Sequence, residues 1–226
     1  MKITFLGQNG ILIESKKSTF VVDPYLSDSV AKTEPQNYRR QKIDERFLSI
    51  KPDAVLITHS HADHYDEETL DRLLGVNVEA TLLAPPSVFC KAKKRYPEHN
   101  CVCFRAGTSY SVKDAVFTAV KAEHSDLEAI GSVIVCEDKK LYVTGDTLYS
   151  ERVFDSLPNT TFDALFLPIN GRGNNMNAVD AARFVERVNA RNVVPTHFGM
   201  FDDMTGKELN CDNAIIPEIY KEIVLK

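Results

Sequence analysis

The chain has 226 residues, of which 43% are hydrophobic and 26% are charged, and its formal net charge is −5. This composition is typical of a globular protein, and the acidic balance argues against a nucleic-acid-binding surface. No apolar run approaches the roughly 20 residues that a membrane span needs, and the N-terminal residues lack the apolar core of a signal peptide. With no repeat or linker, we expect one domain over residues 1–226 and no membrane partner.

The five cysteines are an odd number at irregular positions, which is typical of reduced thiols and indicates a cytoplasmic protein. Cys101 and Cys103 lie two apart in a strand-like stretch, but no second pair completes a structural zinc site. We therefore interpret both as core residues.

The first half of the chain begins with strand-like segments and continues with alternating strands and helices. The patterns predict strands over Lys2–Leu6, Ile11–Glu14, Thr19–Asp23, Ala54–Ile57, Ala80–Ala84 and Cys101–Phe104. They predict helices over Asp66–Leu74, which Asp66 would cap, and over Ser87–Arg95. The polar segment 24–46 has no such period, and its Lys32, Arg39 and Arg40 could form a lid over an anionic ligand. A solvated charged loop explains the same residues.

The second half repeats this organisation. Four strand-like runs cover Ser109–Val112, Val116–Ala122, Gly131–Glu137 and Lys140–Thr144. Further predicted elements are a helix over Tyr149–Leu157, a strand over Ala164–Pro168, a helix over Ala178–Asn189 capped by Asn177, a strand over Asn192–Pro195 and a closing helix over Pro217–Val224. Strand-rich blocks followed by alternation, present twice, favour an α+β protein with two packed sheets and helices outside.

The segment 58–66 is the most informative part of the chain, because it places three histidines and an aspartate within six positions after the apolar run 54–57. Three further candidate ligands each follow an apolar, strand-like segment. The full set is His59, His61, Asp63, His64, His124, Asp146 and His197. Imidazole and carboxylate ligands suit zinc, manganese or iron, and a set this large without cysteine predicts a dinuclear hydrolytic centre.

The HxHxDH motif at residues 59–64, together with His124, Asp146 and His197, resembles the metallo-β-lactamase superfamily. The N-terminal Gly-x-x-x-Ile-Leu-Ile-Glu, the Val-Asp-Pro-Tyr-Leu segment at 22–26 and residues 168–171 are similar to its ascorbate-6-phosphate lactonase-like branch. The resemblance implies a four-layer αββα sandwich of two mixed β-sheets flanked by helices, with the site at one edge of the sheets.

The resemblance also implies two divalent metal ions as cofactors, zinc or manganese. The ligands that it implies are His59, His61 and His124 for the first ion, Asp63, His64 and His197 for the second, and Asp146 for both. Asp146 stands where zinc-dependent β-lactamases typically have cysteine, which counts against antibiotic hydrolysis. His61 stands where flavodiiron electron carriers often have glutamate, and no flavin domain follows, so hydrolysis is favoured over redox chemistry.

A metal-bound hydroxide is the expected nucleophile, because two neighbouring divalent ions lower the pKa of a shared water. Asp63 could orient the hydroxide and accept a proton, and Asp146 would hold the two ions together. The two ions, two carboxylates and one hydroxide leave a positive charge, which favours an anionic substrate. We therefore predict hydrolysis of a small anionic ester, lactone or phosphoester, for example a sugar-phosphate lactone.

Two features near the ligands are candidates for supporting roles. The loop after residue 169 is rich in amides, and we expect Asn170, Arg172 and Asn174 to contact the anionic substrate. A surface Gly/Asn loop with a solvated arginine explains this loop equally well. Asp23 ends a strand and could orient a ligand histidine, or could serve only the turn before Pro24.

Other functions remain as alternatives. The same metal centre serves phosphodiesterases and nucleases, although the acidic balance argues against a nucleic-acid partner. Thioester hydrolysis of the glyoxalase II kind is disfavoured because the chain leaves little room for an added C-terminal substrate domain. A non-catalytic metal or metabolite sensor is the non-enzymatic alternative. The sequence does not define the oligomeric state.

Overall fold

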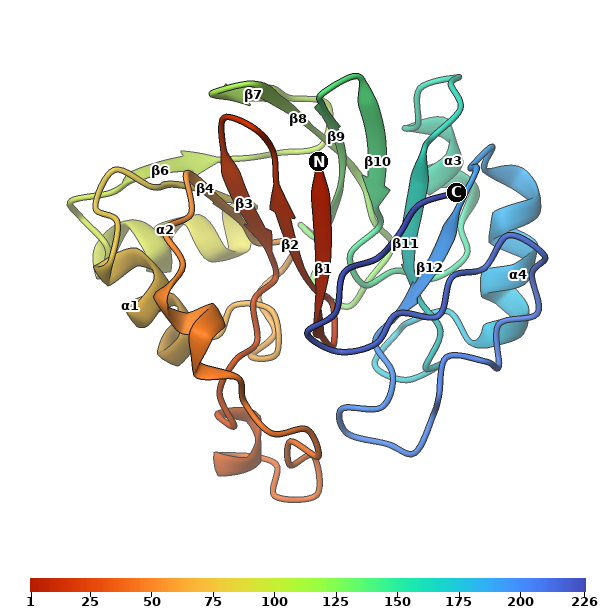
Figure 1. Ribbon diagram of the computed structural model, residues 1–226, viewed down its shortest axis with the longest axis horizontal. Helices are drawn as coiled ribbons and strands as arrows, with labels where there is room; N and C mark the ends of the chain where they lie inside the picture. The colour runs from red at the N-terminus through yellow and green to blue at the C-terminus, as the bar shows by residue number, and fades with distance from the viewer.

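Two six-stranded β-sheets make up most of the computed structural model, which describes residues 1–226 (Figure 1). The first sheet contains β1 (Lys2–Gly7), β2 (Gly10–Glu14), β3 (Thr19–Val22), β4 (Ala54–Leu56), β5 (Thr81–Ala84) and β6 (Asn100–Cys103). The second contains β7 (Ser109–Val112), β8 (Ala115–Lys121), β9 (Ile130–Cys136), β10 (Lys139–Val143), β11 (Ala164–Pro168) and β12 (Val193–Thr196). The α-helices are α1 (Glu67–Gly75), α2 (Pro86–Arg95), α3 (Glu151–Asp155) and α4 (Ala178–Arg187), and short 3-10 helices are η1 (Val30–Lys32) and η2 (Glu45–Ser49).

Both sheets are mixed. In the first sheet, β1, β2 and β3 pair antiparallel, whereas β3 to β6 pair parallel. In the second sheet, β7 to β10 are antiparallel, and β10, β11 and β12 are parallel. Parallel neighbours need crossover connections, and α1, α2, α3 and α4 lie in four of these crossovers. No helix is both long and apolar enough to cross a membrane.

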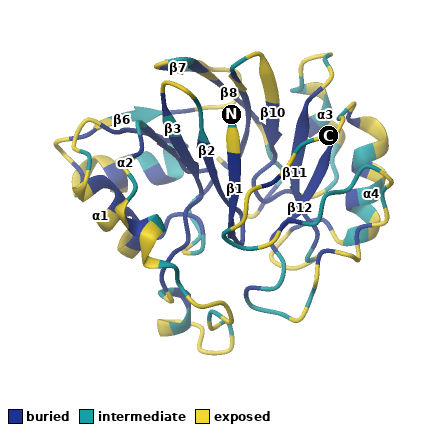
Figure 2. Ribbon diagram, viewed as in Figure 1, coloured by how far each residue is buried: buried dark blue, intermediate teal, exposed yellow.

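The hydrophobic core lies in three layers that correspond to the faces of the sheets. The largest cluster contains 23 buried residues from both sheets, and Phe20 of β3 packs edge-on against Phe117 of β8 at 5.2 Å between ring centroids. In β4 the side chains alternate: Leu56 faces this central layer, while Val55 packs with Leu70 of α1. Figure 2 shows the helices with buried inner and exposed outer sides. The predicted αββα sandwich is therefore confirmed.

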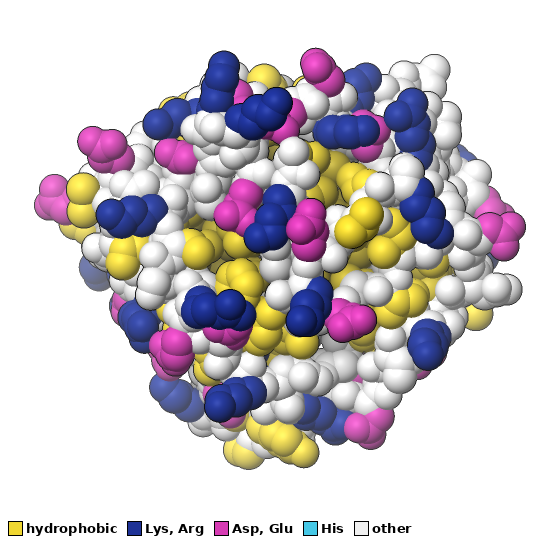
Figure 3. All heavy atoms as spheres, in the orientation of Figure 1, with side chains coloured by type: hydrophobic (Ala, Val, Ile, Leu, Met, Phe, Trp, Pro, Cys, Tyr) yellow, Lys and Arg dark blue, Asp and Glu magenta, His cyan; other side chains and the backbone are white.

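The predicted closing helix over Pro217–Val224 is wrong, because the C-terminal segment is extended and irregular. It runs between β1 and β12, the strands at the two adjoining edges of the sheets (Figure 1). Its residue Ile223 donates a backbone hydrogen bond to Ile3 of β1 at 2.7 Å, and Ile215 donates one to Val193 of β12 at 2.8 Å. Edge strands present backbone N–H and C=O groups that are costly to bury without a partner, so pairing with β1 and β12 outweighs the local helical pattern. Figure 3 shows this face, where charges of both signs alternate around apolar side chains.

Smaller differences concern the ends of elements. The helix predicted over Tyr149–Leu157 is present but covers only the five residues of α3. Asn177 caps α4 as predicted, since its side chain accepts hydrogen bonds from Val179 and Asp180, both at 2.9 Å. Asp66 is the N-cap residue of α1, but its side chain caps no backbone N–H there and accepts from Thr69 instead. Cys101 and Cys103, predicted to be core residues, are half-buried.

Candidate metal centre

The loop that follows β4 turns its histidines inward. Backbone hydrogen bonds from His64 (3.0 Å) and Tyr65 (2.8 Å) to the carbonyl of His61 fold the loop into a tight turn. As a result His59 and His64 are fully buried, although they lie in a loop. Polar side chains at such positions require partners, which the second sheet supplies.

Three strands of the second sheet deliver the remaining candidates. The strands β8, β10 and β12 run in the same direction, so they end at one edge of the sheet. His124, Asp146 and His197 follow these three ends. Gly145 permits the close approach of Asp146, since a Cβ at Gly145 would lie only 2.8 Å from both the Ile130 carbonyl oxygen and the Thr58 Cβ. The topology therefore brings residues from both sheets to one place.

The first group of candidate ligands consists of His59, His61 and His124. Nδ1 of His61 lies 3.0 Å from Nε2 of His59 and 3.2 Å from Nε2 of His124. Three ring nitrogens thus face a common point. Because neutral imidazole carries only one N–H, such a meeting of nitrogen atoms suits a shared cation.

The second group consists of Asp63, His64 and His197, and Asp146 lies between the two groups. His197 Nε2 is 3.2 Å from an oxygen of Asp63 and 3.1 Å from Oδ2 of Asp146. Asp146 also approaches His64 Nε2 at 3.4 Å and His59 Nε2 at 4.0 Å. A carboxylate that reaches histidines of both groups is in the place of a bridging ligand.

The chemistry of His64 tests whether these residues fit a metal. Its Nδ1 lies 2.8 Å from Oδ2 of Asp23, whereas its Nε2 is buried and has no hydrogen-bond partner. A carboxylate at Nδ1 fixes the tautomer that leaves Nε2 with a lone pair, which is how histidine ligands are usually oriented. The site therefore fits a divalent cation, and the interpretation of Asp23 as an orienting residue agrees with its position.

The electrostatic environment differs between the two groups. Burial lowers the pKa of His59 well below its usual value, and it lowers the pKa of His124 as well. Burial also acts to lower the pKa of His197, but nearby carboxylates, above all Asp146, outweigh it and raise this pKa to about 10. Burial acts to raise the pKa of Asp146, yet His197 and His64 hold it well below its usual range. His59 and His124 of the first group thus favour the neutral form, whereas His197 and Asp146 form a charged pair.

Sequence analysis missed two amide side chains that support the second group. Gln8, which is 1% exposed, donates from its side-chain Nε2 to Oδ2 of Asp63 at 2.7 Å, and its backbone carbonyl accepts from the backbone N–H of His197 at 2.7 Å. Asn175 donates to Asp146 at 2.8 Å. The sequence carries a weak signal for Gln8, because the turn Gly-Gln-Asn-Gly at residues 7–10 is rich in side-chain amides, like the loop after residue 169.

A pocket of about 300 Å³ opens onto the second group. Asn170 and Arg172 line it, and Asn170 lies 2.8 Å from the ring of His197. The side chain of Asn174 is outside the lining, but its carbonyl lies 3.2 Å from Nδ1 of His124. Thus two of the three expected substrate contacts border the pocket, and the third orients a candidate ligand.

The segment 24–46 contributes to the pocket wall, but not through its basic residues. Its residues that line the pocket are Val30, Thr33, Glu34 and Asn37. Lys32 pairs with Glu68, Arg40 pairs with Asp203, and Arg39 donates to the Tyr25 carbonyl at 2.7 Å. Because these three cations are engaged elsewhere, the structure agrees with a charged surface loop, the alternative that the sequence also allows.

Comparison with known proteins adds the family. A family profile described as "Beta-lactamase superfamily domain" matches residues 2–197, which contain all the candidate ligands. The chain belongs to the β-lactamase superfamily. Within it, a UPF0173 metal-dependent hydrolase of Oenococcus oeni is 27% identical over 98% of this chain and 99% of its own length. A UPF0173 protein of Pyrococcus abyssi is 28% identical over 89% of this chain and 85% of its own.

Two solved structures share the fold. The metallo hydrolase Igni18 of Ignicoccus hospitalis covers 98% of this chain and 97% of its own with a TM-score of 0.73 and 17% identity. The metallo-β-lactamase fold protein YhfI of Bacillus subtilis covers 99% of both chains with a TM-score of 0.72 and 18% identity. The predicted superfamily is confirmed, while the similarity to the lactonase-like branch stays a prediction.

Proposed function

We propose that this chain is a hydrolase that holds two divalent ions, zinc or manganese, and cleaves a small anionic ester, lactone or phosphoester. The meeting of two ligand groups around Asp146 carries the proposal. The relatives named metal-dependent hydrolases, which match over nearly the whole chain, support it. A sugar-phosphate lactone is one such substrate.

All five cysteines are free, which supports the expected cytoplasmic location.

The ions would be held by His59, His61 and His124 on one side, by Asp63, His64 and His197 on the other, and by Asp146 between them. When bound, such a pair of ions lowers the pKa of water and polarises a carbonyl or phosphoryl oxygen.

Asp63 is the acceptor that the chain provides for the proton of the attacking water. It lines the pocket, and Gln8 holds its Oδ2, while its Oδ1 accepts no hydrogen bond. The water oxygen forms a bond to the substrate carbon or phosphorus as Asp63 takes the proton. The bond to the alcohol oxygen then breaks, and the proton passes to that oxygen.

Arg172 supports an anionic substrate. Arg172 lines the pocket, and its guanidinium has no ion-pair or hydrogen-bond partner in the structure. The planar fork of arginine suits a carboxylate or phosphate, and it lies in the same pocket as Asp63 and Asp146. Arg172 could therefore bind an anionic group of the substrate while the bond to be cleaved lies beside Asp63 and Asp146.

Substituting Asp146 tests the proposal. We expect the native protein to bind two ions per chain by elemental analysis, and Asp146→Ala to lose at least one of them. Hydrolysis should fall by more than about 100-fold, because losing even a group behind a metal ligand costs 10- to 100-fold. His99→Ala is the matched control, since His99 is the one histidine outside the cluster. Two-ion occupancy in Asp146→Ala would contradict the bridging role.

The substrate panel distinguishes the alternatives. Turnover of generic esters, lactones or bis-p-nitrophenyl phosphate would support a hydrolase. Stoichiometric metal without turnover across a broad anionic panel would indicate a sensor. Retention of RNA that weakens steeply with salt would indicate a nuclease.

A further inference from the structure

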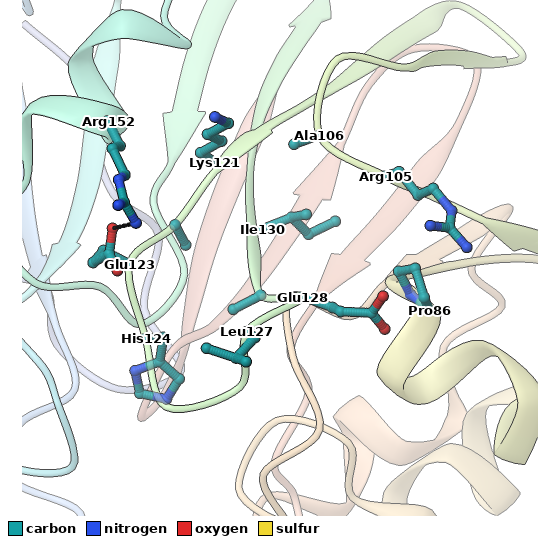
Figure 4. A pocket seen from close by; sticks show the side chains of 12 residues that line it. Pro86, Arg105, Ala106, Lys121, Glu123, His124, Leu127, Glu128, Ile130 and Arg152 are labelled. Atoms are coloured by element: carbon teal, nitrogen blue, oxygen red, sulfur yellow. Dashed lines mark ion pairs between the residues drawn. The ribbon is translucent and has the colours of Figure 1, made fainter.

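A second hollow, which we call the basic groove, lies beside the metal centre (Figure 4). Its volume is about 480 Å³, which is larger than that of the pocket lined by Arg172. The loop after β6, the end of β8 and the helix α3 border it. His124 belongs both to the groove and to the first ligand group, so the groove begins at the metal centre.

The rim of the basic groove carries three cations: Arg105, Lys121 and Arg152. Arg152 pairs with Glu123 at 3.7 Å, but the side chains of Arg105 and Lys121 have no ion-pair or hydrogen-bond partner. Figure 4 shows Arg105 and Arg152 on opposite sides of the groove.

The free state of Arg105 is unusual in this chain. Every other arginine except Arg172 contacts a carboxylate, a carbonyl or a hydroxyl group. The two exceptions, Arg105 and Arg172, each line a hollow that also includes candidate metal ligands. Unpaired guanidinium groups at a metal centre are suited to acidic groups of a ligand.

Apolar residues make up part of the lining of the basic groove. They include the buried Ala129 and Ile130, together with Ala106 and Ala122. Leu127 projects from the same loop as His124 and is 95% exposed, the most exposed large apolar side chain of the protein. Apolar lining residues beside unpaired cations match a ligand that has an apolar body and an acidic end.

We propose that the basic groove binds the part of the substrate beyond the scissile bond, and that this part is an apolar segment ending in a carboxylate or phosphate. The inference rests on the proposed function, because it places the scissile bond at the metal centre. Two acidic residues, Glu123 and Glu128, also line the groove. Glu123 is paired with Arg152, so the two unpaired cations still outnumber the one unpaired carboxylate, that of Glu128. Arg105 and Lys121 are then specificity-determining residues for one half of the substrate.

Binding of two matched probes tests the inference without turnover. The probes are 4-(4-hydroxyphenyl)butanoate and its primary amide, which have the same size and differ in charge. By calorimetry on zinc-loaded protein, we expect the acid to bind about tenfold more tightly than the amide, from two partly exposed ion pairs. Arg105→Gln/Lys121→Gln should abolish this preference.

The matched control is Lys91→Gln/Lys94→Gln, which removes the same charge from two exposed, unpaired lysines of α2. It should retain the preference. Equal binding of acid and amide to the native protein would overturn the inference. So would an acid preference that survives in Arg105→Gln/Lys121→Gln, since the acid would then be binding to the metal ions.

The acetate esters of the two probes separate this inference from the proposed function. Their leaving groups have closely similar pKa values, so kcat/KM should differ mainly through the distal charge. A native preference for the acidic ester that disappears in Arg105→Gln/Lys121→Gln supports both proposals. Binding that depends on the groove, with no hydrolysis of either ester or of the wider panel, keeps the groove and rejects the hydrolase.

Discussion

Gln8 links the N-terminal hairpin to two candidate ligands far away in the sequence. Its backbone has a φ of 53°, a conformation that glycine adopts without strain. Gln8→Gly therefore removes the amide without opposing the turn. We expect the affinity for the ion at Asp63, His64 and His197 to fall about 10- to 100-fold, as for other residues that orient metal ligands. Calorimetric titration of the metal-free protein, resolved into two sites, measures this.

A matched control separates the lost contact from the glycine itself. Lys113 in the turn between β7 and β8 has a φ of 54° and lies far from the ligands in the sequence, so Lys113→Gly makes the same backbone change elsewhere. Its two metal affinities should equal those of the native protein. If Gln8→Gly bound both ions with native affinity, the positioning role of Gln8 would be rejected.

At the scale of elements, Asp163, which directly precedes β11, contacts β10 and the segment that leads into β12. Its carboxylate accepts from the Lys140 N–H at 2.9 Å, from Lys139 at 3.0 Å and from Arg191 at 3.2 Å. Burial acts to raise the pKa of Asp163, but the Lys140 N–H and Lys139 outweigh it and lower this pKa. A lowered pKa in the folded state adds stability above the unfolded value near pH 4, and this stability is lost as the pH falls below it.

Asp163→Asn should therefore destabilise the protein at pH 7 by about 1.5–3 kcal/mol, the range for hydrogen bonds to a charged group. The difference from the native protein should shrink as the pH falls through about 4 and below. Urea unfolding of the metal-free proteins at pH 7 and at pH 3.5 measures both values. Asp155→Asn, in an exposed position of α3, should show no such difference. A penalty that stays constant with pH would reject the ionic role.

Local sequence patterns predicted those elements that are stabilised mainly by residues nearby in the sequence. The apolar run at 54–57 became β4, and the α4 cap at Asn177 formed because its partners are two and three residues away. The pattern at 217–224 failed for the opposite reason: its backbone pairs with β1, which is more than 200 residues distant in the chain. Such long-range pairing leaves no signal in a local window.

At the scale of the whole molecule, the lack of a local signal for long-range contacts also explains which residues of the site could be predicted from the sequence. Histidine and aspartate at strand ends are conspicuous because these side chains bind metals, whatever surrounds them. Gln8 acts only through Asp63 and His197, at separations of 55 and 189 residues, which become contacts only when the two sheets pack. The basic groove likewise combines 12 residues that lie between Pro86 and Arg152 in the sequence, and His124 is the one candidate metal ligand among them.

The candidate ligands join the two sheets, and this gives metal removal a predictable effect on stability. His59, His61, Asp63 and His64 follow β4 of the first sheet, whereas the other three follow strands of the second. Bound ions would cross-link the sheets, and they would bind the folded chain much more strongly than the unfolded one. At free metal 100 times the dissociation constant, this stabilises the folded state by about 2.7 kcal/mol.

For a chain of this length we therefore expect chelation to lower Tm by about 5–11 °C. Differential scanning calorimetry with zinc and with EDTA measures the shift, which should grow with the free zinc concentration. His99→Ala should keep the zinc-dependent increment, and Asp146→Ala should lose much of it, because Asp146 alone reaches histidines of both groups. A Tm that is independent of zinc in the native protein would mean that the cluster does not bind ions preferentially in the folded state.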